Sequence, residues 1–156
     1  MDSGFIRRLD LKDLKRVIEL ERICFNKYTA YHPKQIRYLL KYANSSCLAE
    51  VLDGYIRGFI IILFRNRSGV AGIETINVDP LFRGRGIAKK LLYAAEKEMQ
   101  SRAVRRVRLE VSAGNASAIN LYEKSGFRKV SLLKDYYKYG FFGTNDAFRM
   151  VKELTT

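Results

Sequence analysis

The chain has 156 residues, 47% of them apolar, which suits one globular domain spanning residues 1–156 around a single core. No apolar run approaches the roughly 20 residues that cross a bilayer, and the N-terminus becomes polar and charged within its first ten residues, unlike a signal peptide. We therefore expect a soluble, cytoplasmic protein.

The charge is strongly positive, with 29 Lys and Arg against 16 Asp and Glu and a net charge of +13. Such a balance favours polyanionic partners, namely a nucleotide-bearing cosubstrate, ribosomal RNA or acidic peptides. No nucleic-acid-binding motif accompanies the charge. Association with the ribosome therefore stays an open alternative.

Metal and thiol chemistry lack support in the sequence. Cys24 and Cys47 have no ligand-like spacing, and the single histidine, His32, has no partner that would suggest a catalytic triad. We expect both cysteines to be packing residues and no metal to be bound, while a disulfide between them stays open.

The first third of the chain predicts two helices. Asp10 and Asp13 resemble a helix cap with a carboxylate three residues on, and the apolar pattern that follows predicts a helix to about Cys24. Residues 26–32 read as a loop. Pro33 suits the first turn of a second helix.

An antiparallel meander follows these helices. Cys47 to Leu52 and Tyr55 to Phe64 are strand-like runs, and the Asp53-Gly54 dipeptide between them is a strong hairpin signal. A polar turn then leads into a third strand, Val70 to Val78.

The segment Arg83 to Ala88 joins this third strand to a helix with one apolar face. The N–H groups of a first helical turn point outward at the positive end of the helix dipole, so they hold an anion. Gly84 and Gly86 let the anion approach the backbone, and Arg83 and Arg85 suit phosphate oxygens. A pyrophosphate fits this description.

Two common phosphate loops are excluded by spacing. The Walker pattern needs a Gly-Lys-Ser/Thr ending, and the dinucleotide fingerprint needs three glycines near a first strand. On these six residues alone, the alternative is a tight strand-to-helix turn with solvated arginines.

The last third predicts a strand over Val104 to Ser112, a helix capped by Asn115 and stopped by Gly126, and closing strands over Phe127 to Lys134 and Asp146 to Lys152. We therefore expect an α/β (α+β) protein with a single mixed, mostly antiparallel central sheet flanked by helices.

The glycine turn Arg83 to Ala88, together with Leu121 to Phe127, resembles the GNAT superfamily of acetyl-CoA-dependent N-acetyltransferases. The resemblance covers nearly the whole chain and implies the GNAT fold. It also implies that the first motif binds the pyrophosphate of acetyl-CoA and that the second supplies a tyrosine beside the CoA sulfur.

Within the superfamily, the chain is most similar to RimI-like and archaeal protein N-terminal acetyltransferases, through Leu109 to Val111, Asn115, Asp135 to Tyr137 and Asp146 to Met150. By this likeness, a backbone N–H near Asn77 or Val78 stabilises the oxyanion. The acetyl-CoA contacts implied are Asn77, Val78, Arg83, Gly84, Arg85, Gly86, Ile87, Ala88, Asn115 and Tyr122. The peptide contacts expected are Tyr28, Tyr31, Tyr136 and Tyr137.

Two features depart from that group. The loop of residues 26–31 lacks the Pro-Glu-Asn motif that many N-terminal acetyltransferases of broad specificity carry there, and only Phe82-Arg83 precedes the first glycine, where a Gln/Arg-Arg pair is usual. The first departure bears on substrate preference and on any catalytic base from that loop.

Acetyl transfer needs a neutral amine, an oxyanion donor and a proton for the departing thiolate. The resemblance favours Glu110 as the base and Tyr122 as the acid, because the family's base and acid have the same spacing. Glu74, in the strand before the glycine turn, is the second candidate base, and a water molecule is the third.

The resulting hypothesis is an enzyme that acetylates the α-amino group of proteins, either one ribosomal protein or many nascent chains. One alternative is an acetyltransferase for small amines such as polyamines or aminoglycosides. The other is a CoA-binding or ribosome-associated module with little or no catalysis.

Overall fold

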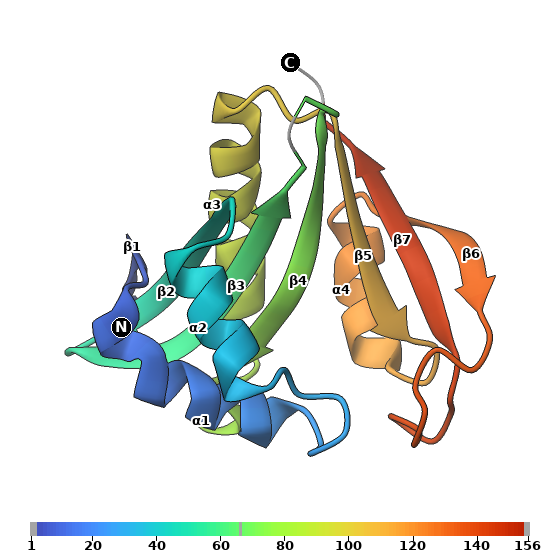
Figure 1. The fold of residues 1–156 in the computed structure, drawn as a ribbon, viewed down its shortest axis with the longest axis horizontal. Coiled ribbons are helices and arrows are strands. Elements are labelled where there is room, and N and C mark those ends of the chain that lie inside the picture. The colour runs from blue at the N-terminus through green and yellow to red at the C-terminus, as the bar shows by residue number, and fades with distance from the viewer. Residues whose placement is uncertain (1–2, 66, 155–156) are drawn as a thin grey trace.

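The computed structural model describes residues 3–65 and 67–154, in which a seven-stranded sheet of order β1-β2-β3-β4-β5-β7-β6 is flanked by four α-helices (Figure 1). The strands are β1 (Phe5–Arg8), β2 (Ser45–Leu52), β3 (Tyr55–Phe64), β4 (Val70–Val78), β5 (Arg106–Ser112), β6 (Arg128–Leu133) and β7 (Ala147–Glu153). The helices are α1 (Leu14–Cys24), α2 (Pro33–Lys41), α3 (Ile87–Ser101) and α4 (Ala116–Lys124), with short 3-10 turns at Leu11–Asp13 and Pro80–Phe82.

The sheet separates two apolar cores, because side chains alternate between its faces along each strand. On β3, Ile61 packs with α1 and α2, whereas its neighbours Ile60 and Ile62 pack with α3 and α4. Helices α1 and α2 therefore cover one face of the sheet, and α3 and α4 cover the other (Figure 1). The mixed, mostly antiparallel sheet predicted from the sequence is confirmed.

The local signals in the sequence are confirmed as well. Asp10 and Asp13 form a reciprocal capping box before α1, and His32 caps α2. The hairpin between β2 and β3 places Asp53 and Gly54 at positive φ, 51° and 76°, as a two-residue primed turn requires.

Strand β1 is the element that the sequence analysis missed. It has four residues, two of them arginines, and pairs antiparallel with β2 at the edge of the sheet. Short, charged edge strands carry little hydrophobic periodicity, which explains the omission.

The cysteines are not joined, since Cys24 and Cys47 are both free. No group of three or more potential metal ligands occurs among the described residues. In the same part of the chain, every helix is too short or too polar to cross a membrane.

The arrangement of β4 and β5 determines where a site forms. The two strands pair in parallel only from Val70 to Gly72, opposite residues 106–108, and then diverge toward the lower end in Figure 1. On its other edge, β4 keeps pairing with β3, but a bulge places one extra residue, Glu74, between the partners of Ile61 and Ile62.

Candidate active site

A cavity of about 670 Å³ occupies the divergence between β4 and β5. It is lined by the second half of β4, the glycine turn, the end of β5, the start of α4 and the two loops at that end of the sheet. The predicted site residues that line it are Tyr31, Glu74, Asn77, Val78, Arg83, Gly84, Gly86, Ile87, Ala88, Glu110, Asn115, Tyr122, Tyr136 and Tyr137.

Two predicted site residues lie outside the cavity lining. Tyr28 is 56% exposed and stacks on Tyr139, with ring centroids 4.2 Å apart. Arg85 is exposed and lies over the ring of Phe82, 5.5 Å from its centroid. The geometry therefore provides no direct cavity contact for either side chain.

The glycine turn has the open backbone that its sequence predicts. Gly84 and Gly86 have φ of 79° and 78°, in the left-handed region that side chains disfavour, and Gly86 is the N-cap of α3. No heavy atom lies within 4 Å of the point where a Cβ would stand on either glycine. A ligand can thus approach the first turn of α3 closely.

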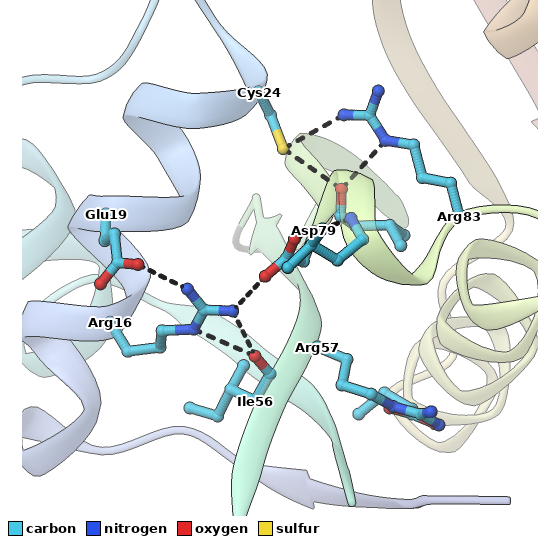
Figure 2. A network of polar contacts seen from close by, with 10 residues as sticks. Arg16, Glu19, Cys24, Ile56, Arg57, Asp79 and Arg83 are labelled. Carbon is cyan, nitrogen blue, oxygen red and sulfur yellow. Dashed lines mark hydrogen bonds and ion pairs between the residues drawn. The ribbon is translucent and has the colours of Figure 1, made fainter. Parts of the chain in front are cut away.

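Asp79, four residues before the glycine turn, connects this part of the chain to α1 (Figure 2). Its carboxylate accepts a hydrogen bond from Arg16 Nη2 at 2.6 Å and another from the backbone of Leu81 at 2.9 Å. Burial opposes ionisation of Asp79, but these two donors outweigh it and hold the pKa of the carboxyl below its usual value. Arg16 also donates to the carbonyl of Ile56, so it ties α1 to both β3 and the turn.

Arg83 makes a second connection to α1. Its Nε donates to the carbonyl of Val78 at 3.1 Å, and its Nη2 contacts Cys24 Sγ at 3.5 Å (Figure 2). The thiol in turn donates to the same carbonyl at 3.4 Å. Burial raises the pKa of Cys24 despite the nearby guanidinium, so the thiol stays protonated at neutral pH.

The cavity is also lined by a buried carboxylate that was not among the predicted site residues. Glu21 of α1 is 1% exposed and accepts hydrogen bonds from Thr75 Oγ1 at 2.9 Å, Asn77 Nδ2 at 3.0 Å and the backbone of Tyr31 at 3.0 Å. The usable signal was a glutamate on the apolar face of a predicted helix, beside Val17 and next to Leu20.

Glu74, the bulge residue, faces the loop between α1 and α2. The hydroxyl of Tyr31 donates to Glu74 Oε2 at 2.6 Å. Burial, and then this hydrogen bond, raise the pKa of Tyr31 far above its ordinary value, so the phenol remains neutral.

Glu110 lies across the cavity on β5, where Arg149 Nε approaches its Oε2 at 3.3 Å. Next to it, Tyr136 and Tyr137 meet edge to face, with ring centroids 5.0 Å apart. Burial, together with the charges of Tyr136 and Glu110, raises the pKa of Tyr137 to about 12. The cavity thus has carboxylates on both strands and neutral phenols between them.

Tyr122 projects into the cavity from α4, a helix that starts where Asn115 caps it through a 3.2 Å hydrogen bond to the backbone of Ala118. The Tyr122 ring is 7% exposed, and burial raises its pKa well above the usual value. A protonated phenol at this point can donate to an electron-rich atom in the cavity at any physiological pH.

Two loops beside the cavity contact each other, and Phe25 and Phe141 from these loops also line it. The ring centroids of Phe25 and Phe141 lie 5.4 Å apart, and Tyr28 stacks on Tyr139. Asn26 Nδ2 also donates to the carbonyl of Gly140 at 3.2 Å. We call the four rings the aromatic bridge.

Comparison with known proteins agrees with this geometry. Residues 14–127 match the model of the acetyltransferase (GNAT) family. An N-alpha-acetyltransferase of Sulfurisphaera tokodaii is 31% identical over 96% of this chain and 92% of its own length. Among solved structures, Ard1 from Thermoplasma volcanium superposes with a TM-score of 0.88 at 27% identity, covering 99% of both chains. The ribosomal-protein-S18-alanine N-acetyltransferase of Escherichia coli gives 0.87 at 25% identity, covering 98% and 95%.

The family model thus covers residues 14–127, which hold the glycine turn and both strands that border the cavity, and the solved structures superpose over nearly the whole chain. The protein is an acetyltransferase of the GNAT family, whose acetyl donor is acetyl-CoA.

Proposed function

We propose that this enzyme transfers the acetyl group to the α-amino group of protein N-termini. The observation that carries this proposal is the aromatic bridge, which joins the two loops beside the cavity and whose Phe25 and Phe141 line it. A chain end can be inserted beneath such a bridge, whereas a lysine in the middle of a chain would need room for the polypeptide on both sides.

The names of similar proteins support the same acceptor. The relatives include an N-alpha-acetyltransferase and ribosomal protein bS18-alanine N-acetyltransferases. The acceptor partner is then a protein or peptide N-terminus. Association with the ribosome would bring the enzyme to such termini, and the net charge of +13 favours a polyanionic surface of that kind.

Acetyl-CoA would lie along the divergence between β4 and β5. The first turn of α3 at Gly84 and Gly86 would hold its pyrophosphate, and Asn115 would contact the pantetheine arm. A backbone N–H near Asn77 or Val78 would stabilise the oxyanion of the tetrahedral intermediate.

In the reaction, the amine nitrogen attacks the thioester carbonyl carbon, and collapse of the tetrahedral intermediate breaks the carbon–sulfur bond. Tyr122 protonates the departing thiolate. Glu110 takes the proton that the amine loses, directly or through water. The unperturbed pKa of an α-amino group is near 8, whereas that of a lysine side chain is about 10.4. An α-amino group therefore needs only modest help from such a base to lose its proton.

The remaining site residues divide between the two sides of the cavity. Tyr31, held by Glu74, and the pair Tyr136 and Tyr137 would line the peptide slot. Tyr28 would act on the substrate only as part of the aromatic bridge, because it stacks on Tyr139 outside the lining.

A small cationic amine is the second candidate acceptor. Three carboxylates, those of Glu21, Glu74 and Glu110, line the cavity of an otherwise basic protein, and they would attract a polyamine. Glu21 and Glu110 are already engaged, by three donors and by Arg149 respectively, which favours the peptide.

A substrate panel tests the proposal. CoA release would be followed with acetyl-CoA and peptides that begin Ser, Ala, Met or Met-Glu, beside spermidine and an internal-lysine peptide with a blocked N-terminus. We expect turnover with at least one free N-terminus and none with the blocked peptide. Turnover with spermidine alone would establish the small-amine alternative, and no turnover with any amine would leave a CoA-binding module.

Replacing Gly86 with alanine tests the proposed pyrophosphate site at the glycine turn. Alanine in the left-handed conformation costs about 1–2 kcal/mol, and a Cβ would enter the space in front of the helix start. We expect the Kd for acetyl-CoA to rise about tenfold, which calorimetry measures. Gly54→Ala is the matched control, because Gly54 has φ +76° and an equally open Cβ position but lies in the β2–β3 hairpin. It should lose similar stability and keep its acetyl-CoA affinity; equal Kd values for both variants would contradict the assignment.

Tyr122→Phe removes the proposed acid and keeps the ring. Loss of a general acid lowers turnover by about 10²–10⁴-fold, so we expect kcat to fall within that range while the Kd for acetyl-CoA changes by less than about threefold. Steady-state kinetics and calorimetry give the two numbers. Tyr93→Phe, at an exposed tyrosine of α3, is the control and should change neither. Unaltered turnover in Tyr122→Phe would remove Tyr122 as the acid.

Glu110→Gln tests the base through pH dependence. Activity falls on the acidic side as the amine and the base each take up a proton, and the glutamine variant loses one of these two ionisations. The acidic limb of log kcat/KM should therefore be shallower than in the wild type. Glu74→Gln, measured in parallel, should retain the wild-type limb; the reverse pattern would transfer the role of base to Glu74.

A further inference from the structure

A second cavity, of about 420 Å³, lies at the opposite end of the molecule from the active site. It forms between the β3–β4 turn and the turn from α3 into β5, at the upper end of the sheet in Figure 1. Strand β4 starts beside it at Val70 and ends at Val78, five residues before the glycine turn. At about 3.3 Å per residue, β4 spans roughly 26 Å between its two ends.

Four arginines line this second cavity, and no acidic residue occurs among its described lining. They are Arg65, Arg67, Arg102 and Arg105, which we call the arginine pocket. Like charges in one pocket repel each other, so the four arginines destabilise the folded protein when no anion is bound between them.

The pocket is held together by the backbone and by Arg102. The carbonyl of Gly69 accepts hydrogen bonds from the backbone N–H groups of Arg105 and Arg106, at 2.8 and 3.1 Å, so the two turns are fixed to each other. The guanidinium of Arg102 lies 4.1 Å from the centroid of the Phe64 ring and donates to Asn44 Oδ1 at 3.4 Å.

Counter-ions for these arginines are scarce within the described residues. Arg102 is 3.6 Å from Glu98, a carboxylate that already accepts from Arg8 at 2.6 Å. Arg65, Arg67 and Arg105 have no ion pair there, in contrast to the neighbouring Arg106, which pairs with Glu153 at 2.9 Å. The pocket therefore keeps a net positive charge.

Arg67 also keeps an unfavourable backbone conformation. Its φ is +62°, a region in which glycine and asparagine are favoured and other residues are uncommon. The side chain of Arg67 lines the pocket and adds a positive charge to it.

Two exposed aromatic rings lie at the end of α2, shortly before Asn44 in the chain. Tyr38 and Tyr42 are 57% and 65% exposed and stack with ring centroids 6.3 Å apart, and Lys41 Nζ lies 5.2 Å from the centroid of the Tyr42 ring. The chain then runs two residues further to Asn44, which lines the arginine pocket.

We propose that the arginine pocket binds the phosphodiester backbone of RNA, with unpaired bases reaching Tyr38 and Tyr42. Forked guanidinium groups match phosphate oxygens, and exposed aromatic rings stack on the bases of single strands. An acidic polypeptide would use the arginines but not the rings. Because the pocket lies at the far end of β4, RNA and acetyl acceptor can be bound together. The proposal does not depend on which amine is acetylated.

The test compares two triple variants of equal charge. The pocket variant carries Arg65→Gln, Arg67→Asn and Arg105→Gln, with asparagine chosen because it tolerates the left-handed conformation. Arg102 stays, since it packs on Phe64. The control variant carries Lys15→Gln, Lys124→Gln and Lys134→Gln, at exposed lysines outside the pocket. Each variant lowers the net charge by three.

Fluorescence anisotropy would measure binding of a labelled 20-nucleotide single-stranded RNA between 50 and 300 mM salt, with polyglutamate as competitor. For the pocket variant, we expect at least tenfold weaker binding at 100 mM salt and a salt slope smaller by about 2, since each lost contact removes about 0.7. The control variant should change affinity by less than threefold, and both should keep wild-type kcat/KM on peptides.

Three outcomes would overturn the proposal. Equal loss of RNA affinity in both variants would indicate a general charge effect. Failure of the wild type to bind RNA would exclude the ligand. Displacement of RNA by polyglutamate at equal charge concentration would identify an acidic polypeptide as the partner instead. Tyr38→Ala with Tyr42→Ala separates these further, because it should weaken RNA binding and leave polyglutamate binding unchanged.

Discussion

The parallel pairing of β4 and β5 stops after three residue pairs, and the active site depends on this early end. Beyond it, each strand leaves one edge of backbone donors and acceptors without the other strand as partner. Backbone groups of this kind must find partners in a ligand or in water. The same divergence separates Glu74 on β4 from Glu110 on β5 and leaves a cavity between them.

A strand that loses one neighbour needs another support, and α1 provides it. Glu21 accepts hydrogen bonds from Thr75 and Asn77 near the end of β4. Just after this strand, Arg16 donates a hydrogen bond to Asp79 (Figure 2). Both sets of hydrogen bonds involve a charged group, and Glu21 is buried, so they are stronger than hydrogen bonds between neutral groups. The helix therefore fixes the position of the glycine turn as well as covering the core.

Much of the fold and the open backbone of the glycine turn could be predicted because their signals are local. The glycine turn, the Asp53-Gly54 hairpin and the Asn115 cap each depend on a few consecutive residues. The contacts of the loops on the other side of the cavity could not be predicted to the same degree. The contact between Tyr31 and Glu74 joins residues 43 positions apart. The stacking of Tyr28 on Tyr139 similarly depends on how two distant loops meet.

The same reasoning explains the arginine pocket. Its four arginines come from two turns that are separated by the whole of β4 and α3, and in the sequence they look like scattered surface charge. Glu21 was missed for a related reason: a helix pattern reports which face is buried but not which polar group the neighbouring strand requires there.

The bulge at Glu74 has a consequence for insertions and deletions in β4 of this chain. Ile73 packs with the α3 core, yet Thr75, two residues on, faces Glu21 of α1 on the opposite side of the sheet. Regular alternation would put both on one face. Loss of one residue here would remove the bulge and either pull the glycine turn back by about 3.3 Å or turn Thr75 and Asn77 away from α1. The number of residues in β4 is therefore constrained to the single residue.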